Sequence, residues 1–293
     1  MSGSRIAILL AAYNGIEFIE QQLLSIKQQK NVDVSVFISV DLSTDNTYEW
    51  CVNYARQHSE ITVLNYGDKF GGAAPNFFRL IKDVDFSGFD YVALADQDDI
   101  WLADKLISAC NHIKEKKVNA YSSNVLAFWD NGREHLINKA QPQRKYDYLF
   151  EAAGPGCTYV LEVKPMLVFK KMIIERWKQV NNVNLHDWLI YAFFRGKGYQ
   201  WFIDPIPKMR YRQHEDNQVG INKGLKAIFR RLALLRNGWY QKQIRLISYL
   251  IDFQTDLIET RWLMLKAINQ LRRRFQDRLM LLIFVLLGFL TSK

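Results

Sequence analysis

The chain has 293 residues, of which 49% are apolar, and this predicts one large domain or one domain with a smaller appendage rather than a disordered protein. The formal net charge is +9, and residues 221–293 hold 14 Lys and Arg against 4 Asp and Glu, so the positive charge belongs to the C-terminal part. The three cysteines lack metal-ligand spacing, which argues against a zinc site. Their odd number, together with an N-terminus that lacks a signal-peptide pattern, predicts a reduced, cytoplasmic setting.

The first half of the chain alternates apolar runs with helical patterns. Buried-strand runs lie at Arg5–Ala12, Asp33–Val40 and Ile61–Asn65, and helices are expected between them at Glu17–Gln29 and from Ser43 to about His58. This alternation of strands and helices predicts a parallel sheet with helices on its faces. A Gly71-Gly72 loop, a helix begun near Pro75 and another buried strand at Tyr91–Ala95 follow.

Two of these strands end in carboxylates. The strand at 91–95 leads into Asp96, Asp98 and Asp99, and the second strand stops at Asp41. Ligands of open α/β sheets bind outside the carboxyl ends of the strands, and carboxylate oxygens suit Mg²⁺ or Mn²⁺ that also carries phosphates. The alternative is an acidic turn that caps a helix beginning near Trp101. Gly-rich phosphate loops of the dehydrogenase and P-loop types are absent from the sequence, which leaves a metal to hold phosphates.

Three shorter motifs in the second half each have an ordinary structural explanation. Residues 154–158 (GPGCT) form a tight turn before a strand at 158–163, whose glycines either let backbone approach a sugar or only make the turn, and Cys157 reads as a packed residue rather than a nucleophile. Asp187 precedes a buried helical run at 189–194 and, taken alone, is a helix-start residue. His214 follows a strand and a Pro-rich turn at 198–207, and a lone His is commonly a hydrogen-bonded surface residue.

Together these motifs resemble the family-2 glycosyltransferases of GT-A fold, in particular the bacterial rhamnosyltransferase-like branch. The strings ILLAAYNG, SVDLSTDNT, ALADQDDIWLADKL, GPGCTYV, LHDWLIY and YRQHEDNQVG keep the family's order over roughly Arg5–Gly220. The resemblance implies an α/β GT-A domain at residues 1–220, with a Rossmann-like, mostly parallel sheet flanked by helices. Residues 221–293 would form a basic, amphipathic helical extension.

The resemblance also implies roles for the acidic residues. Residues 96–99 (DQDD) match the family's D-x-D motif, with Asp98 as the metal ligand, His214 completing the shell of a Mg²⁺ or Mn²⁺ ion, and Asp96 near the ribose or phosphates. Asp187 would be the general base, and it must be ionised at neutral pH, which a polar neighbourhood including His186 would favour.

The nucleotide sugar is expected to contact a further set of residues. Asp41 matches the second Asp of the family's D-D-G-S pattern, which binds the nucleobase, although Val40 and Leu42 stand where Asp and Gly are usual. The other expected contacts are Tyr13 in the base pocket, Arg212 at the diphosphate, and Ala11, Asn76 and Gln97.

The activity implied by the resemblance is an inverting, metal-dependent sugar transfer. The expected donor is dTDP-L-rhamnose, and the expected acceptor is a lipid-linked oligosaccharide of bacterial surface polysaccharide such as O-antigen. A UDP-hexose donor is an alternative, as is a non-catalytic nucleotide-sugar or glycan-binding protein, which Val40 and Leu42 favour. A sugar-1-phosphate nucleotidyltransferase is less consistent with the sequence, because residues 13–17 (YNGIE) lack a Gly-rich, basic loop.

The C-terminal part predicts contact with an anionic surface. Residues 223–235 and 239–250 are amphipathic, a helical pattern covers 252–271, and Arg272, Arg273, Arg274 and Arg278 precede the apolar run Leu279–Leu287. Even extended to Leu290 this run is 12 residues long, short of the roughly 20 that span a bilayer. We therefore expect a peripheral location at the inner face of the cell membrane. The alternatives are a helical subdomain packed on the sheet or an oligomer contact, and no motif indicates nucleic-acid binding.

Overall fold

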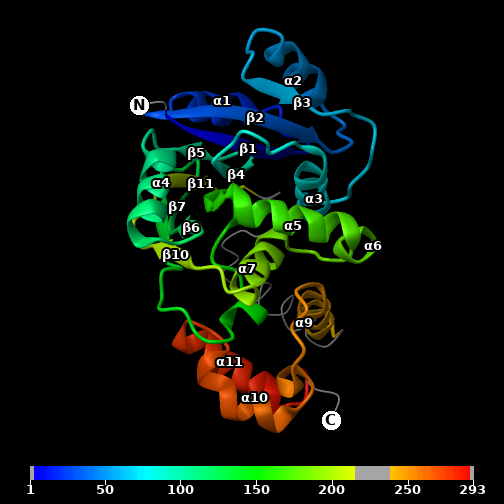
Figure 1. The fold of residues 1–293 in the computed structure, drawn as a ribbon. Helices are drawn as coiled ribbons and strands as arrows, with labels where there is room; N and C mark the ends of the chain where they lie inside the picture. Colours follow the sequence, from blue (N-terminus) through cyan, green and yellow to red (C-terminus); the bar gives the residue numbers. More distant parts are fainter. Residues whose placement is uncertain (1–2, 215–237, 291–293) are drawn as a thin grey trace.

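The computed structural model describes residues 3–214 and 238–290, and a seven-stranded sheet lies at its centre (Figure 1). The strand order is β10-β6-β9-β4-β1-β2-β3. β1 runs parallel to β2 and β4, β2 to β3, and β6 to β10, whereas β9 runs antiparallel to both of its neighbours. The predicted, mostly parallel α/β sheet is thereby confirmed. The strands are β1 (Ser4–Ala12), β2 (Val32–Val40), β3 (Ile61–Val63), β4 (Tyr91–Asp96), β6 (Ala120–Ser123), β9 (Val160–Glu162) and β10 (Trp201–Asp204).

Helices cover both faces of this sheet because its central strands are apolar on both sides. Along β1, Ala7 and Leu9 belong to one buried cluster, and Ile6, Ile8 and Leu10 belong to the other, as the two-residue period of a strand requires. The even-numbered face packs on α1 (Ile19–Lys27), α2 (Thr47–Ala55) and α4 (Lys105–Lys116). The odd-numbered face packs on α3 (Ala73–Asp83), α5 (Val163–Glu175), α6 (Trp177–Val180) and α7 (His186–Gly196).

A second, four-stranded sheet brings a late segment of the chain next to the acidic motif. Its order is β5 (Ile100–Trp101), β11 (Met209–Arg212), β7 (Val125–Phe128) and β8 (Glu134–Ile137). Trp101 therefore lies in a strand that pairs with Met209, and α4 begins only at Lys105. The alternative in which the acidic motif caps a helix near Trp101 is wrong, because β5 follows the motif directly.

The C-terminal helices share a core with the sheet. They are α9 (Trp239–Leu250), α10 (Arg261–Ala267) and α11 (Phe275–Leu286), and they form the end of the molecule opposite α2 (Figure 1). Ile247, Leu281 and Val285 are buried in the same cluster as α7. The continuous helical pattern expected over 252–271 is interrupted, because Asp252 adopts a left-handed φ of 56° and single 3-10 turns flank α10.

Two expectations about this region fall outside the described residues: the domain boundary at 220 and the amphipathic segment 223–235. Within the described ranges, no helix is both long and apolar enough to cross a membrane.

The arginines before α11 do not act together at the surface. Arg273 is buried and pairs with Asp147 and Glu151, and Arg272 donates to the carbonyl oxygen of Phe150. Only Arg274 of the three is exposed. The expected row of lipid-facing arginines therefore differs from the structure at its first two positions, which join α11 to the rest of the fold.

Candidate active site

A large cavity opens at the carboxyl ends of β1, β2 and β4. Its volume is about 1620 Å³, and its lining extends from Asp41 and Asp98, past Asp187 on α7, to Arg274 at the start of α11. Pockets for one small ligand are commonly about 300–1000 Å³. The cavity therefore has room for a nucleotide sugar and an acceptor together.

The three carboxylates after β4 take different positions. Asp98 lines the cavity, and its Oδ2 lies 2.7 Å from Nε2 of His214, which also lines it. Asp96 faces the same cavity. Asp99 is buried outside the lining and accepts a hydrogen bond from the backbone N–H of Arg212 at 3.3 Å. The pairing of β5 with β11 thus places the predicted metal residues, which are far apart in the sequence, side by side.

Asp98 and His214 fit a divalent metal ion. In an octahedral Mg²⁺ site, ligand atoms in adjacent positions lie about 3 Å apart, which is close to the observed 2.7 Å. A carboxylate suits Mg²⁺ or Mn²⁺, and a neutral imidazole nitrogen is a common metal ligand. The His214 ring stacks on Phe18 with centroids 5.1 Å apart, which restricts its orientation.

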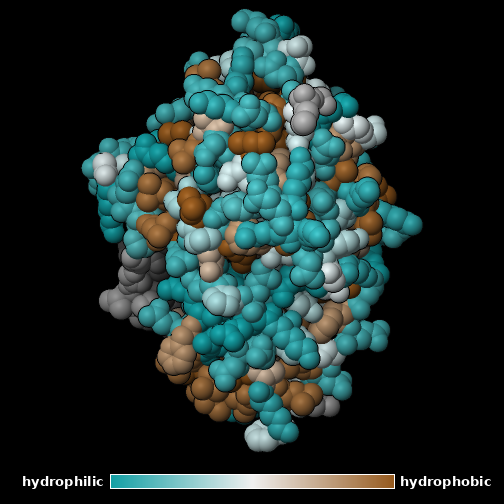
Figure 2. All heavy atoms as spheres, turned by 60° about the vertical axis from the view of Figure 1, so that its left-hand side comes forward, coloured by the Kyte–Doolittle hydropathy of each residue, from teal (hydrophilic) through white to brown (hydrophobic). Residues whose placement is uncertain are grey.

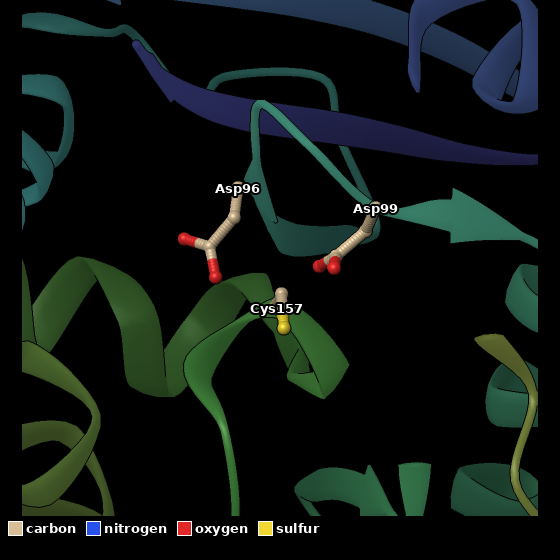
Figure 3. Close-up of side chains that lie close together, drawn as sticks. All are labelled: Asp96, Asp99 and Cys157. Atoms are coloured by element: carbon tan, nitrogen blue, oxygen red, sulfur yellow. The ribbon is translucent and has the colours of Figure 1, made fainter. Parts of the chain in front are cut away.

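A second cluster involves the other two carboxylates of the acidic motif. Figure 3 shows the carboxylates of Asp96 and Asp99 converging on Cys157, and one ligand atom of each residue lies within 4.8 Å of the others. Burial raises the pKa of Cys157 well above its usual range, which keeps it as a thiol, a poor ligand for the hard cations Mg²⁺ and Mn²⁺. Burial, together with the charge of Asp98, raises the pKa of Asp96 to about 7. A cation bound nearby would lower that pKa and ionise Asp96.

Asp41 borders the cavity, and both of its carboxylate oxygens accept hydrogen bonds from backbone N–H groups. Its Oδ1 accepts from the N–H groups of Leu42 and Phe70 at 2.8 and 2.7 Å, and its Oδ2 accepts from that of Gly71 at 2.8 Å. These bonds position the loop containing Gly71, and the direct contact of Asp41 with a nucleobase stays a prediction. Val40 is a core residue and Leu42 an exposed lining residue, so neither supplies a polar group here.

Gln97 and Tyr13 form a two-sided bridge between the ends of β1 and β4. The Tyr13 N–H donates to Gln97 Oε1 and the Gln97 amide donates to the Tyr13 carbonyl oxygen, both at 2.8 Å. A Cβ at Gly15 would lie 2.0 Å from Gln97 Oε1, so this approach requires glycine. The Tyr13 side chain is 53% exposed and lines the cavity, where it is available for stacking.

Ala11 and Asn76, the remaining expected contacts, both line the cavity. The amide of Asn76 donates to the carbonyl oxygens of Ala12 and Ser39, which fixes α3 against the ends of β1 and β2. Its Oδ1 is buried without a hydrogen-bond partner.

Arg212 is placed differently from the expectation. Its Nε donates to the carbonyl oxygen of Asp98 at 3.0 Å, its guanidinium also contacts Gln21 and Asp130, and it is not part of the cavity lining. The bond to Asp98 braces the backbone that carries this residue, and the diphosphate contact of Arg212 stays a prediction.

Asp187 stands in the first turn of α7 and faces the cavity. Burial raises its pKa to about 6, opposed by the N–H of Trp188, which donates to Oδ1 at 2.7 Å, and by the positive charge of Lys139. Such a carboxylate is ionised at neutral pH and is a stronger base than an ordinary one. Lys139 belongs to no recognisable motif, so nothing in the sequence indicated its place here.

His186 does not help to ionise Asp187, contrary to the expectation. Its ring stacks on Phe77 with centroids 4.0 Å apart, and burial lowers its pKa to about 3, so it is neutral. A Cβ at Gly156 would lie 2.4 Å from His186 Nε2. The second glycine of the GPG turn, Gly156, is therefore explained by packing, because its backbone lies against the imidazole of His186.

The sequence model described as Glycosyl transferase family 2 matches residues 7–177, and the chain belongs to this family. The protein is a glycosyltransferase of GT-A fold. It is 50% identical over 240 residues to "dTDP-rhamnosyl transferase RfbG" of Shigella flexneri, covering 82% of this chain and 83% of that one. It is 22% identical over 169 residues to the Escherichia coli "UDP-Glc:alpha-D-GlcNAc-diphosphoundecaprenol beta-1,3-glucosyltransferase WfgD", covering 55% and 61%.

Solved structures share the fold at low identity. S. aureus TarS residues 1–349 in complex with UDP matches with a TM-score of 0.56 and 11% identity, covering 87% of this chain and 72% of that one. The mannosyltransferase PcManGT from Pyrobaculum calidifontis, in complex with GDP-Man and Mn²⁺, matches with a TM-score of 0.52 and 15% identity, covering 98% and 81%.

Proposed function

We propose that this glycosyltransferase transfers L-rhamnose from dTDP-L-rhamnose, with inversion, to a lipid-linked saccharide of bacterial surface polysaccharide. The donor follows the 50% identical relative, whose name specifies dTDP-rhamnosyl transfer. The observation that carries the reaction is that the Asp98–His214 pair and Asp187 face one cavity, with Asp187 tuned to a pKa of about 6.

Asp187 would accept the proton from the acceptor hydroxyl as that oxygen attacks the anomeric carbon. Its Oδ1 is held by the Trp188 N–H, which leaves the other oxygen available to the acceptor. Attack from the side opposite the leaving nucleotide inverts the anomeric configuration. This requires the base and the diphosphate site to flank the sugar, and in support of it Asp187 and Asp98 both line the cavity.

Asp98 and His214 would hold a Mg²⁺ or Mn²⁺ ion, with Asp96 beside them. When bound, such an ion neutralises charge on the departing nucleotide diphosphate. The chain's own residues prepare the place: Arg212 fixes the backbone of Asp98, and Phe18 fixes the His214 ring. The Mn²⁺ in the mannosyltransferase structure is in keeping with this assignment.

The C-terminal helices would rest on the cytoplasmic face of an anionic membrane. Apolar side chains gather at the end of the molecule formed by α10 and α11 (Figure 2). Phe275 is 70% exposed, Leu287 64% and Trp262 62%. Exposed Arg274 borders the same face, so apolar insertion and attraction to anionic lipid would act together. This face adjoins the cavity, because Arg274 and Met280 of α11 line it.

A donor screen tests the reaction. We expect hydrolysis or transfer with dTDP-L-rhamnose, dependent on Mg²⁺ or Mn²⁺ and abolished by EDTA. Preference for UDP-glucose would reject the rhamnose assignment. Activity that survives both EDTA and Asp98→Ala would reject the metal site.

Vesicle sedimentation tests the membrane contact. The wild-type protein should sediment with phosphatidylglycerol vesicles, and the double variant Phe275→Ser, Leu287→Ser should remain in the supernatant. The variant should stay folded, because both side chains are exposed. Loss of a dimer in this variant, with unchanged vesicle binding, would identify the face as a contact between two copies.

A further inference from the structure

The end of the cavity next to α11 carries three cations without a carboxylate within ion-pair distance among residues 3–214 and 238–290. Lys139, Arg272 and Arg274 all line the cavity. Arg272 donates to two neutral acceptors, the Phe150 carbonyl oxygen and the Tyr240 hydroxyl. Within the described part of the chain, the Arg274 guanidinium donates to the amide oxygen of Gln276, at 3.3 Å.

Two neighbouring carboxylates, Glu151 and Asp277, favour the charged forms of Lys139 and Arg272, but they are fewer than the cations. Glu151 also accepts from the backbone N–H of Arg273 and pairs with its guanidinium, so its charge is shared with a further cation. Asp277 is the remaining carboxylate of the lining at this end. The cavity wall therefore keeps an excess of positive charge beside α11.

Burial opposes the charged forms of Lys139 and Arg272, whereas Arg274 is exposed. The Nε of Arg272 is buried without a hydrogen-bond partner. Burial also lowers the pKa of Lys139, an effect that the charge of Glu151 opposes. Desolvated cations are stable when they are paired and hydrogen-bonded, so these groups are suited to a negatively charged ligand.

The first turn of α11 adds backbone donors. Arg274 is the N-cap residue of this 12-residue helix, and no side chain caps it. Arg274, Asp277 and Met280 follow one another at three-residue intervals and all line the cavity, so this face of the helix borders it. A helix N-terminus favours phosphate oxygens through its free N–H groups and its dipole.

We propose that Lys139, Arg272 and Arg274 bind the diphosphate of the lipid-linked acceptor. This assignment rests on the proposed function and adds the subsite that recognises the acceptor. The position of these three cations suits both the saccharide and the lipid of such an acceptor. Lys139 lies close enough to Asp187 to influence its ionisation, so the saccharide would extend toward the base. Met280 leads onto the exposed apolar face of α11, where the lipid would lie.

The test compares two acceptors that carry the same sugar, one on an alkyl diphosphate and one on a neutral alkyl glycoside. Assays in neutral detergent at pH 8 keep Asp187 ionised and remove lipid headgroups. The wild-type protein should prefer the diphosphate acceptor through a lower KM. Lys139→Met and Arg274→Gln should each reduce the ratio of kcat/KM between the two acceptors roughly ten- to a hundredfold, the loss of one charge-assisted contact. Arg272 is not varied, because its bonds to Phe150 and Tyr240 support the fold.

Lys242→Met and Arg56→Gln are matched controls, since both side chains are exposed and neither lines the cavity. They should keep the wild-type ratio. Calorimetry with the alkyl diphosphate-linked sugar, in EDTA and without donor, provides a second readout that needs no turnover. Tight binding that weakens in Lys139→Met and Arg274→Gln supports the subsite even if dTDP-L-rhamnose is not the donor.

Two results would overturn the proposal. One is equal affinity of the wild-type protein for the diphosphate-linked and neutral acceptors. The other is loss of binding to phosphatidylglycerol vesicles in these variants while acceptor affinity stays unchanged, which would assign the cations to lipid headgroups. Failure of transfer to both acceptors, with diphosphate binding intact, would reject the proposed donor and leave the subsite standing.

Discussion

Replacing Asp187 with asparagine should stabilise the protein while it slows the reaction. Burial raises the pKa of Asp187 from its ordinary value of 3.8 to about 6, so the folded state holds the ionised carboxylate at a cost. The full difference corresponds to at most about 3 kcal/mol at neutral pH. Because the side chain is partly exposed to the cavity, we expect a gain of about 1–2 kcal/mol in the free energy of unfolding.

The pH dependence distinguishes this cause from better packing. The cost is fully present above pH 6 and disappears as the pH falls toward 3.8, since the wild-type carboxyl group then becomes protonated in the folded state. The stability difference between Asp187→Asn and wild type should therefore shrink to about half between pH 7.5 and pH 5. Asparagine can still accept the Trp188 N–H through its Oδ1.

Urea unfolding at these two pH values gives the stability, and initial rates with saturating donor give turnover. Turnover should fall by about 10² to 10⁴, the usual contribution of a general base. A variant that is less stable than wild type at both pH values, or a stability gain independent of pH, would refute the electrostatic argument. Turnover within about threefold of wild type would return Asp187 to the role of a helix-start residue.

Three further predictions concern the metal pair, the GPG turn and the C-terminal helices. His214→Ala should weaken Mn²⁺-dependent nucleotide binding at least about tenfold in calorimetry, and unchanged binding would remove His214 from the metal site. Gly156→Ala should cost roughly 1–3 kcal/mol in urea unfolding, because its Cβ would collide with the His186 ring, and wild-type stability would show that the ring can move aside. Leu281→Ala should cost about 2–5 kcal/mol. The exposed Leu287→Ala should cost less than about 0.5 kcal/mol, and equal losses from the two would contradict the packing of α11.

The sequence was sufficient where local pattern determines structure. The apolar runs that became β1, β2 and β4 have enough buried length to be recognised, and the turn or acidic residues after them mark the carboxyl ends of the strands. The helix containing Asp187 was similarly clear from the apolar run that follows it. Local pattern therefore located the sheet, the cavity edge and several lining residues.

Features that depend on distant pairing could not be predicted in this way. Trp101 entered a strand because Met209 pairs with it, although the surrounding residues are compatible with a helix. His186 was expected to favour the ionised form of Asp187, but its ring stacks on Phe77, which lies over a hundred residues earlier in the chain. Arg272 and Arg273 belong to a basic run that is typical of a surface, yet tertiary hydrogen bonds turn them inward.

The antiparallel strand β9 has a consequence for how the chain folds. It has only three residues, yet it joins two blocks of the central sheet, β4-β1-β2-β3 on one side and β6-β10 on the other. Closure of the sheet therefore waits for residues distant in sequence, such as Tyr91 and Glu162, to meet, a topology that favours slow folding. Until then β4 and β6 are open edges exposed to aggregation. A nascent chain that stops before β9 would contain β1, β2, β3 and β4 without the strand that joins them to β6 and β10.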